Sequence, residues 1–270
     1  MNQYKNVNEL WAAVVNGDTK PAVSDYFVTG ASYIYQTTQF PDSSTKYHNY
    51  YLLLRVGAYF GACSHVPEQL GVDAAGELSG KALKSCLTDP RLPVRIAAMD
   101  AYFGTVYPHE RQCSEAVELP GGTPTEKAEF RDNLIADIAK VEQGMKIALI
   151  GVVNPLVAAI RKRGGTCLPC DLQMERTQWG DPVEKDMEKV LDSADGVICT
   201  GMTLSNGTFD RVIERVLERS IPLTVYAQTG SAVAARFVGA GITSLVAEPF
   251  PFSQFSANAT RVFCYRGQGD

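Results

Sequence analysis

The chain has 270 residues, 45% of them hydrophobic and 20% charged, which suits one large or two small globular domains with a buried core. Its net charge of −5 disfavours non-specific binding to nucleic acid or to an anionic membrane. No run of 18 apolar residues occurs, and the N-terminal stretch lacks the basic-then-apolar pattern of a signal peptide, so we expect a cytoplasmic protein without a membrane span.

The first 110 residues are predicted to form strands and then helices, the pattern of a small α+β domain. Leu10, Trp11 and Val14 indicate a short helix over residues 5–16. Tyrosine-rich and β-branched runs between turn-forming residues then predict strands, and apolar residues at helical spacing predict helices. The strands are expected over 26–29, 32–36 and 50–56, and the helices over 80–87 and from Pro93 onward.

A boundary between two domains is predicted near residue 122. Residues 111–124 contain the Pro120-Gly121-Gly122 cluster, which is typical of a connecting loop. A capping box from Thr123 to Glu126 then begins a helix that leads into the first strand of the second domain. We therefore divide the chain into an α+β cap domain, residues 1–122, and a second domain, residues 123–270.

Residues 146–171 read as strand, turn, helix and strand. The apolar run Ile147–Ile150 predicts the first strand, and Asn154 is placed to cap a helix with Pro155 in its first position. Thr166–Cys170 predicts the second strand. This order is the opening βαβ unit of a parallel, nucleotide-binding type of sheet.

The alternation of helices and strands continues to the end of the chain. A further capping box is predicted from Asp181 to Glu184, and residues 261–265 are expected to add an edge strand. Because crossovers between parallel strands are right-handed, the whole segment predicts a Rossmann-like α/β sheet with helices on both faces. Further strands are expected over 196–200, 223–226 and 243–246, and helices over 209–217 and 231–238.

Ligands of open parallel sheets bind beyond the carboxyl ends of the strands, and this rule selects four loops. Their hydroxyl and amide side chains, close to helix N-termini, suit phosphate, carboxylate or ribose oxygens. The alternative is that these residues only form turns and caps. The cofactor-binding candidates are Gly151, Asn154, Asp171, Thr200, Gly201, Met202, Thr203, Asn206, Gln228, Thr229, Gly230 and Ser231.

Asp171 is the candidate for a ribose contact, because it lies 20 residues after Gly151, where such folds often place a carboxylate. The phosphate-binding pattern itself is incomplete, since Gly151 is followed by Val-Val-Asn-Pro rather than by the spacing G-x-G-x-x-G. This departure weakens NAD in particular as the ligand.

Motifs in both halves of the chain follow the pattern of one protein family. The C-terminal half carries Thr200-Gly201-x-Thr203-x-x-Asn206-Gly207-Thr208, then Gly230-Ser231 and Gly239-Ala240-Gly241. The N-terminal part carries Arg55-Val56-Gly57, Ala75-Gly76-x-Leu78-x-Gly80 and Ala97-Ala98-Met99-Asp100-Ala101. Over roughly residues 45–265, these motifs resemble the family described as "putative heavy-metal chelation". The resemblance implies an enolase N-terminal-like first domain, a Rossmann-like second domain and a cleft between them.

The cysteines do not by themselves predict a metal site. Seven are present, an odd number, and without an export signal a disulfide framework is not expected. Cys167 and Cys170 form a lone C-x-x-C, whereas zinc sites need four ligands. On a regular strand these two residues point to opposite faces, so we assign no metal ligands and favour two separate buried thiols.

Tyrosine is concentrated in the predicted cap, where seven of the twelve tyrosines lie between positions 26 and 59. Strand propensity explains such a cluster, but several aromatic faces can also form a cage for a positively charged sulfonium. Asp100, in the middle of an apolar helix, is either a structural acceptor or a carboxylate that faces the cleft. Asp100 and Tyr51 are the catalytic candidates.

The function that we predict is binding of a small, nucleotide-type ligand in the cleft, by an enzyme of small-metabolite biosynthesis that uses S-adenosylmethionine. The alternatives are a protein that binds a metal or a metal chelate, and an NAD-dependent enzyme. The expected partner is a small molecule, not nucleic acid or membrane, and a homodimer is left open.

Overall fold

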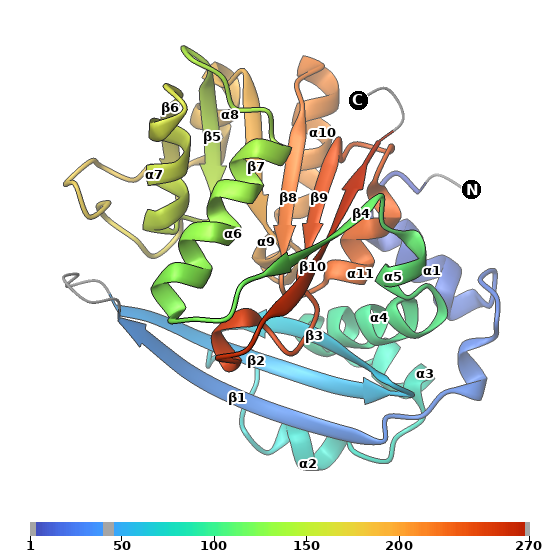
Figure 1. Cartoon of the computed structure of the whole chain (residues 1–270). Coiled ribbons are helices and arrows are strands. Elements are labelled where there is room, and N and C mark those ends of the chain that lie inside the picture. Colours follow the sequence, from blue (N-terminus) through green and yellow to red (C-terminus); the bar gives the residue numbers. More distant parts are fainter. Residues whose placement is uncertain (1–3, 40–45, 268–270) are drawn as a thin grey trace.

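The computed structural model describes residues 4–39 and 46–267 and shows a mixed α/β protein with two separate sheets (Figure 1). A three-stranded antiparallel sheet comes from the N-terminal part of the chain. A seven-stranded, mostly parallel sheet comes from the rest. The predicted fold class, a parallel α/β sheet preceded by a smaller α+β unit, is confirmed.

The N-terminal unit packs its longest helix against one face of its small sheet. The strands follow the order β1-β2-β3, and consecutive strands are antiparallel. The elements are α1 (Val7–Asn16), the 3-10 turn η1 (Val23–Asp25), β1 (Gly30–Gln39), β2 (Lys46–Val56), β3 (Tyr59–His65), α2 (Ala74–Leu78), α3 (Leu83–Leu87), α4 (Leu92–Val106) and α5 (His109–Gln112).

The large sheet has the strand order β4-β10-β9-β8-β7-β5-β6, in which the strands from β9 to β6 are parallel. Strand β10 is antiparallel to β9, and β4 is antiparallel to β10. The elements are β4 (Glu115–Leu119), α6 (Pro124–Ile138), β5 (Lys146–Ile150), α7 (Asn154–Lys162), β6 (Thr166–Cys170), α8 (Met187–Ser193), β7 (Gly196–Thr200), α9 (Met202–Ser205), α10 (Phe209–Arg219), β8 (Leu223–Ala227), α11 (Ser231–Ala234), η2 (Ala235–Phe237), β9 (Ser244–Ala247), η3 (Ser253–Phe255) and β10 (Thr260–Arg266).

Helices cover both faces of the large sheet (Figure 1). Helices α6 and α7 pack on one face, where Leu156 of α7 joins Leu149 and Ile198 of the strands in one buried cluster. Helices α8, α10 and α11 pack on the other face. Alternating side chains of each strand supply both clusters, as expected for strands that are buried on two sides.

Helix α4 lies between the two sheets and is buried on all sides. It contacts β2 and β3 on one side and α9 and α11 on the other. Apart from Arg95 and Asp100, its sequence is accordingly apolar around most of the circumference. One continuous apolar core therefore joins residues of the cap unit with residues of the large sheet.

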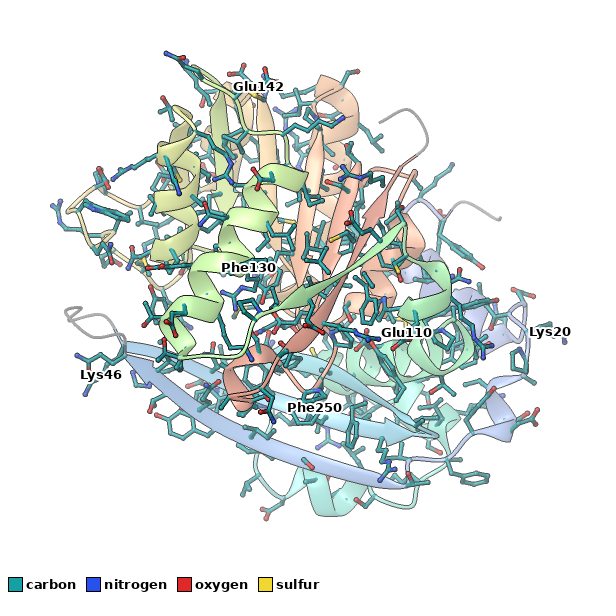
Figure 2. The ribbon with its side chains drawn as sticks, viewed as in Figure 1. Lys20, Lys46, Glu110, Phe130, Glu142 and Phe250 are labelled. Atoms are coloured by element: carbon teal, nitrogen blue, oxygen red, sulfur yellow. The ribbon has the colours of Figure 1, made fainter. Side chains whose placement is uncertain are left out.

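A second, smaller apolar cluster covers the other face of the three-stranded sheet. Phe250 and Phe252 follow β9 and pack against this sheet, where Phe250 lies 5.3 Å from the Phe60 ring between centroids. Figure 2 shows Phe250 beside the small sheet. The segment after β9 thus closes the molecule between the two sheets.

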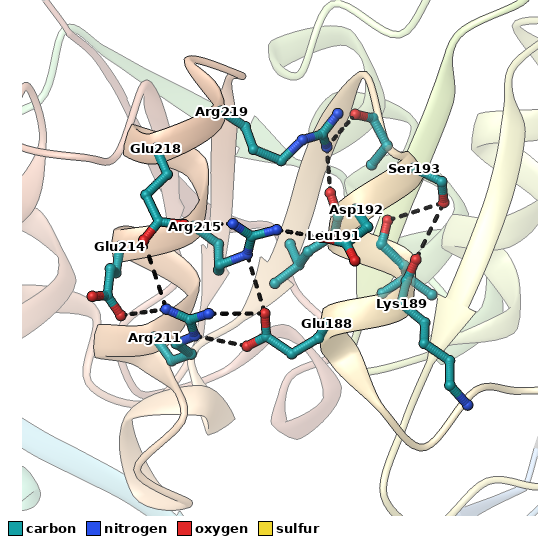
Figure 3. Close-up of polar contacts among 12 residues, drawn as sticks. Glu188, Lys189, Leu191, Asp192, Ser193, Arg211, Glu214, Arg215, Glu218 and Arg219 are labelled. Carbon is teal, nitrogen blue, oxygen red and sulfur yellow. Dashed lines mark hydrogen bonds and ion pairs between the residues drawn. The ribbon is translucent and has the colours of Figure 1, made fainter.

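An ion-pair network joins the outer surfaces of α8 and α10 (Figure 3). Arg211 donates to Glu188 at 2.7 Å and to Glu214 at 2.6 Å, and Arg215 pairs with Asp192. Apart from Arg215, these side chains are substantially exposed, so we assign the network little stability and no binding role.

Several local predictions for the cap unit are corrected by the structure. Residues 26–29 form only an isolated bridge at Phe27, and the strand begins at Gly30. Of the helix predicted over 80–87, only Leu83–Leu87 is helical, as α3; α2 ends before this range at Leu78, and Gly80 has a φ of +82°. Short polar and glycine-rich stretches can follow either conformation, and tertiary packing selects one.

Other corrections concern the second half. The Asp181–Glu184 capping box is wrong, because Pro182 forms a bridge with Arg176, Glu184 forms one with Cys170 of β6, and α8 begins after Asp186. Asn154 is the first residue of α7 rather than its cap. The predicted boundary loop contains β4, and β10 is not an edge strand because β4 covers it.

No helix within the described residues combines the length and hydrophobicity that crossing a membrane requires.

Candidate functional site

A cavity of about 160 Å³ lies between the inner face of the small sheet, helix α6 and the carboxyl ends of β7 and β8. Polar and apolar side chains from both halves of the chain contribute to its wall. The lining residues are Gln36, Thr38, Tyr47, Asn49, Tyr51, Ser64, Pro124, Ala128, Arg131, Val153, Pro155, Thr200, Gly201, Met202, Tyr226, Gln228, Thr229, Ser253 and Gln254.

The two-residue period of the strands selects which cap residues reach this cavity. On β2, Tyr47, Asn49 and Tyr51 share the face that lines it. On β1, Gln36 and Thr38 do the same. The cap therefore presents amide and hydroxyl groups to the ends of the parallel strands.

Close backbone approach shapes the opposite wall. A Cβ atom at Gly201 would lie 2.3 Å from the Thr229 carbonyl oxygen, so only glycine fits where β7 ends. Gly201 also donates its N–H to the Tyr226 carbonyl at 2.8 Å. The loops after β7 and β8 are thereby held together at the cavity.

The only buried charge that borders the cavity is the guanidinium of Arg131, among the described lining residues. Its side chain is 12% exposed and lies over the Tyr226 ring, 5.0 Å from the centroid. Its Nε–H donates to Asp132 Oδ1 at 2.8 Å, and a terminal nitrogen lies 3.9 Å from Glu248 Oε2. Four of the five N–H groups thus have no acceptor at hydrogen-bond distance within residues 4–39 and 46–267.

Glu248, which follows β9, organises the floor behind Arg131. It is fully buried and accepts hydrogen bonds from the Tyr226 hydroxyl at 2.5 Å, from Gln228 Nε2 at 3.0 Å and from the Ser253 N–H. Gln254 Nε2 in turn donates to Gln228 Oε1 at 3.2 Å. These bonds hold the two glutamines in fixed positions at the cavity wall.

Asp132 lies next to Arg131 and is fully buried. Its Oδ2 atom has no hydrogen-bond partner among the described residues. Burial raises the pKa of the Asp132 carboxyl, and the Arg131 charge opposes this.

Six of the predicted site residues line the cavity: Tyr51, Thr200, Gly201, Met202, Gln228 and Thr229. Tyr51 is 5% exposed, and burial raises the pKa of its hydroxyl, which therefore stays protonated. Its oxygen lies 3.4 Å from Gln254 Nε2. This tyrosine can bind a ligand as a hydrogen-bond donor.

Other predicted residues support the wall from behind. Asn154 donates to the Tyr47 hydroxyl at 3.0 Å through its side chain. Thr203 donates to the Thr200 carbonyl at 2.8 Å, and Gly230 donates its N–H to Ala62 of β3 at 2.8 Å. None of these three is among the lining residues.

Asp171, Gly151 and Asn206 also lie outside the lining set. The Asp171 carboxylate accepts N–H groups from Val152 at 3.0 Å, from Gln173 at 2.8 Å and from Met174 at 3.0 Å. Gly151 has a φ of +88°, and a Cβ there would overlap Thr200. Asn206 Oδ1 accepts from Thr208, so its amide closes a local turn.

Asp100 lies at the junction of three elements rather than in the cavity. It is 1% exposed and accepts the N–H of Ala62 in β3 at 2.8 Å and that of Ala232 in α11 at 2.7 Å. Burial raises the pKa of Asp100 to about 7, against the effect of these backbone bonds. Its carboxylate therefore ties α4 to both units of the fold.

Asp100→Asn is expected to lower the free energy of unfolding by about 2 kcal/mol, because its NH₂ would face a backbone N–H that the carboxylate accepts. Guanidinium titration at neutral pH measures this loss. Wild-type stability in Asp100→Asn would contradict the structural role. Asp73→Asn is the matched control, because the Asp73 side chain is exposed and makes no capping hydrogen bond to α2.

A second buried polar cluster contains Ser231. Its Oγ lies 3.1 Å from His109 Nε2 and 3.2 Å from the Tyr59 hydroxyl, and His109 Nδ1 lies 2.6 Å from the Tyr265 hydroxyl. The pair has the spacing of a nucleophile and its base. His109 is 1% exposed and Ser231 0%, however, and neither lines the cavity, so we assign the cluster to packing.

The two cysteines of the C-x-x-C lie on β6. Burial raises the pKa of Cys167 to about 12 and that of Cys170 to about 11, which disfavours the thiolate that a metal requires. Among the described residues, no group of three or more His, Cys, Asp or Glu side chains could hold a metal ion.

The sequence reasoning missed Arg131, Glu248 and Gln254. A signal for Arg131 was present, because it lies three residues after Ala128 and four before Ile135, on the buried stripe of α6. A charged residue on an apolar helix stripe is either paired or functional. Glu248 and Gln254 follow the last parallel strand, and no local pattern marks them.

Residues 133–243 match the sequence profile of the family described as "Putative heavy-metal chelation", DUF364, which confirms the resemblance predicted from the motifs. A structure of a DUF364 protein of unknown function from Desulfitobacterium hafniense has a TM-score of 0.62 and 15% identity, over 96% of this chain and 97% of that chain. A second, from Pyrococcus horikoshii, has a TM-score of 0.56 and 13% identity, over 95% and 99%. These likenesses show a shared fold. No curated protein is similar in sequence to this chain.

Proposed function

We propose that this protein binds a small anionic metal chelate, a metal ion already held by a carboxylate ligand, in the cavity between the small sheet and the ends of β7 and β8. The observation that carries the proposal is Arg131, whose guanidinium borders the cavity with most of its N–H groups uncommitted. A guanidinium in a partly dry site binds carboxylates through paired, charge-assisted hydrogen bonds.

The charge at the cavity wall favours a chelate over a bare metal ion. An aqua cation would meet the positive charge of Arg131, whereas the outer carboxylate oxygens of a chelate would be attracted to it. Asn49, Gln228 and Gln254 add neutral amide groups that can bond to further ligand oxygens. The family description, heavy-metal chelation, supports a link to metals.

The size of the cavity favours a small ligand. Its volume of about 160 Å³ is below the roughly 300–1,000 Å³ of typical drug-sized pockets. A complex of citrate size suits this space, whereas a complete dinucleotide would require the cap to move away from the parallel strands. Because the cavity suits a ligand of this size without movement of the cap, we favour the chelate over NAD as the ligand.

S-adenosylmethionine is the second candidate, because Tyr47 and Tyr51 line the same cavity as Arg131. Its carboxylate could bond to Arg131 while its sulfonium lies against a tyrosine ring. The remaining cap tyrosines do not join such a cage. Tyr33, Tyr35 and Tyr50 stack on the opposite face of the sheet.

Thermal-shift and calorimetric titrations with the Ni²⁺ complexes of citrate and of nitrilotriacetate test the proposal. Ni²⁺ alone, citrate alone, S-adenosylmethionine and NAD are the comparison ligands. A ligand at 100 times its dissociation constant stabilises the folded state by about 2.7 kcal/mol, which a melting curve resolves. We expect a shift with at least one chelate and a smaller one with Ni²⁺ alone.

Arg131→Gln should weaken chelate binding by roughly ten- to a hundredfold, because charge-assisted hydrogen bonds of about 1.5–3 kcal/mol are lost. Asn49→Asp is the second variant, since it adds a negative charge to the cavity wall without altering the Arg131 contacts. Asn206→Asp is the matched control outside the cavity and should leave the affinity unchanged.

Equal affinity of the Ni²⁺ complexes for the wild type and for Arg131→Gln would contradict the chelate proposal, and so would tighter binding of Ni²⁺ alone than of either complex. Selective binding of S-adenosylmethionine that Arg131→Gln abolishes would favour the second candidate instead.

A further inference from the structure

Strand β1 leaves one of its edges unpaired over most of its length. It is the outer strand of the small sheet, with β2 on its inner side (Figure 1). The N–H of Ala31 points away from β2 and donates to Ser79 Oγ at 3.0 Å. Because the hydrogen-bonding direction alternates along a strand, the N–H and C=O groups of Tyr33, Tyr35 and Thr37 point outward in the same way.

No hydrogen bond joins these outward groups to another residue in the described part of the chain. Helix α2 and its cap Ser79 cover only the beginning of β1. Lys46, labelled in Figure 2, begins β2 opposite the far end of β1. The stretch between these two points is an open edge.

The open edge lacks the features by which proteins keep such strands apart. Natural edge strands carry charged residues or proline, or they are covered. The ten residues of β1, GASYIYQTTQ, contain neither a charge nor a proline. By contrast, the outer strand β4 carries exposed Glu115 and Glu118, and the end of β6 is paired with Glu184.

We propose that β1 is the interface of a homodimer in which the β1 strands of two copies pair antiparallel, so that the two small sheets form one six-stranded sheet. A second copy fits this edge because antiparallel pairing about a twofold axis satisfies the same N–H and C=O groups on both chains. No charge on β1 meets its own copy across the axis.

Tyr35, in the middle of the open edge, supports a second copy of the chain as the partner. Tyr35 is 53% exposed and stacks on Tyr50, 4.6 Å between ring centroids. With Tyr35 on the twofold axis, the two copies of its ring lie side by side, and Tyr33 of each copy lies opposite Thr37 of the other. Cross-strand aromatic pairs stabilise such contacts.

The dimer is independent of the proposed ligand. Gln36 and Thr38 project from the same strand toward the cavity, on the face opposite Tyr35. Pairing at the edge would hold the strand that carries them on both sides, without closing the cavity.

Sedimentation velocity and light scattering from micromolar to submillimolar concentration test the proposal. We expect a concentration-dependent species of twice 29.4 kDa. Thr37→Pro removes an outward N–H from both copies, while the bonds between β1 and β2 stay intact. It should weaken the dimer by roughly ten- to a hundredfold. Thr37→Val keeps the N–H and should leave the dimer unchanged.

Amide hydrogen exchange of the wild type locates the interface even where Thr37→Pro fails to fold. The N–H groups of Tyr33, Tyr35 and Thr37 should gain protection as the concentration rises, whereas those of Ile34 and Gln36 should be protected at every concentration. A monomer throughout the range overturns the proposal. So does a dimer in which the three outward N–H groups still exchange rapidly.

Discussion

Gly61→Ala is expected to lower the free energy of unfolding by about 3–5 kcal/mol, the largest loss that we expect from adding one methyl group. A Cβ at Gly61 would lie 2.1 Å from the Ala101 nitrogen and 2.3 Å from the Ala97 carbonyl oxygen. Both atoms belong to the backbone of α4, so no rotation of a side chain can relieve the overlap. Strand β3 and helix α4 would have to separate.

Gly76→Ala is the matched control, because nothing lies within 4 Å of a Cβ at that position in helix α2. Alanine is the better helix former, so this variant should be as stable as the wild type or slightly more stable. Urea titrations of the three proteins measure the effect. A Gly61→Ala protein with wild-type stability would mean that β3 does not approach α4 this closely.

Acid is expected to remove stability through His109, and this is the second large effect. The imidazole is buried among Tyr59, Ser231 and Tyr265 and stacks on Phe263. Burial, followed by the charge of Arg236, lowers its pKa from 6.5 to about 3. The folded state therefore holds this histidine neutral at a pH where the unfolded chain has already bound a proton.

The direction in which stability changes with pH follows from this difference in the pKa of His109 between the folded and unfolded states. The contribution of His109 is complete above pH 6.5 and is lost as the pH falls toward 3. At about 1.4 kcal/mol for each pH unit, roughly 3 kcal/mol is lost between pH 6.5 and pH 4. Asp100 acts in the opposite direction, because its pKa is raised to about 7, so its contribution is present below pH 3.8 and is lost as the pH rises through 7.

The pH effects of His109 and Asp100 on the free energy of unfolding nearly cancel in the wild type. The contribution of His109 is therefore measured as the difference in free energy of unfolding between the wild type and a His109 variant. The free energy of unfolding of the wild type minus that of His109→Gln should fall by about 3 kcal/mol from pH 7 to pH 4. A difference that stays constant over this range would contradict the buried, neutral imidazole. Where His109→Gln does not fold, an NMR titration of the wild-type imidazole replaces it, with no protonation expected down to pH 4.

The order of elements in the second half could be read from the sequence because each signal is local. The apolar runs Ile147–Ile150 and Gly196–Thr200 form β5 and β7, and the capping box at Thr123 begins α6 as predicted. Parallel strands that are buried on both faces are continuous apolar runs, which few other structures produce. The sequence alone therefore predicted that the loops after β7 and β8 lie at the ligand-binding edge of the sheet.

The rest of the site depends on contacts between distant residues. Arg131 on α6, Glu248 after β9 and Asn49 on β2 meet only through tertiary packing, and no spacing in the chain relates them. Local bonds that no spacing predicts also surround Asp171, whose carboxylate accepts three backbone N–H groups. Propensity describes what one segment prefers, whereas burial and partner geometry belong to the whole fold.

The tyrosines between positions 26 and 59 also show which features the sequence determines and which only the tertiary structure decides. Their concentration between positions 26 and 59 marked a strand-rich segment, and composition was sufficient for that conclusion. The sequence also determined that neighbours on a strand face opposite sides, because the pleat alternates. Which side holds the cavity was decided only when α4 packed against one face of the small sheet and left Tyr47 and Tyr51 on the other, since the apolar surface of a helix must be buried against a complementary face.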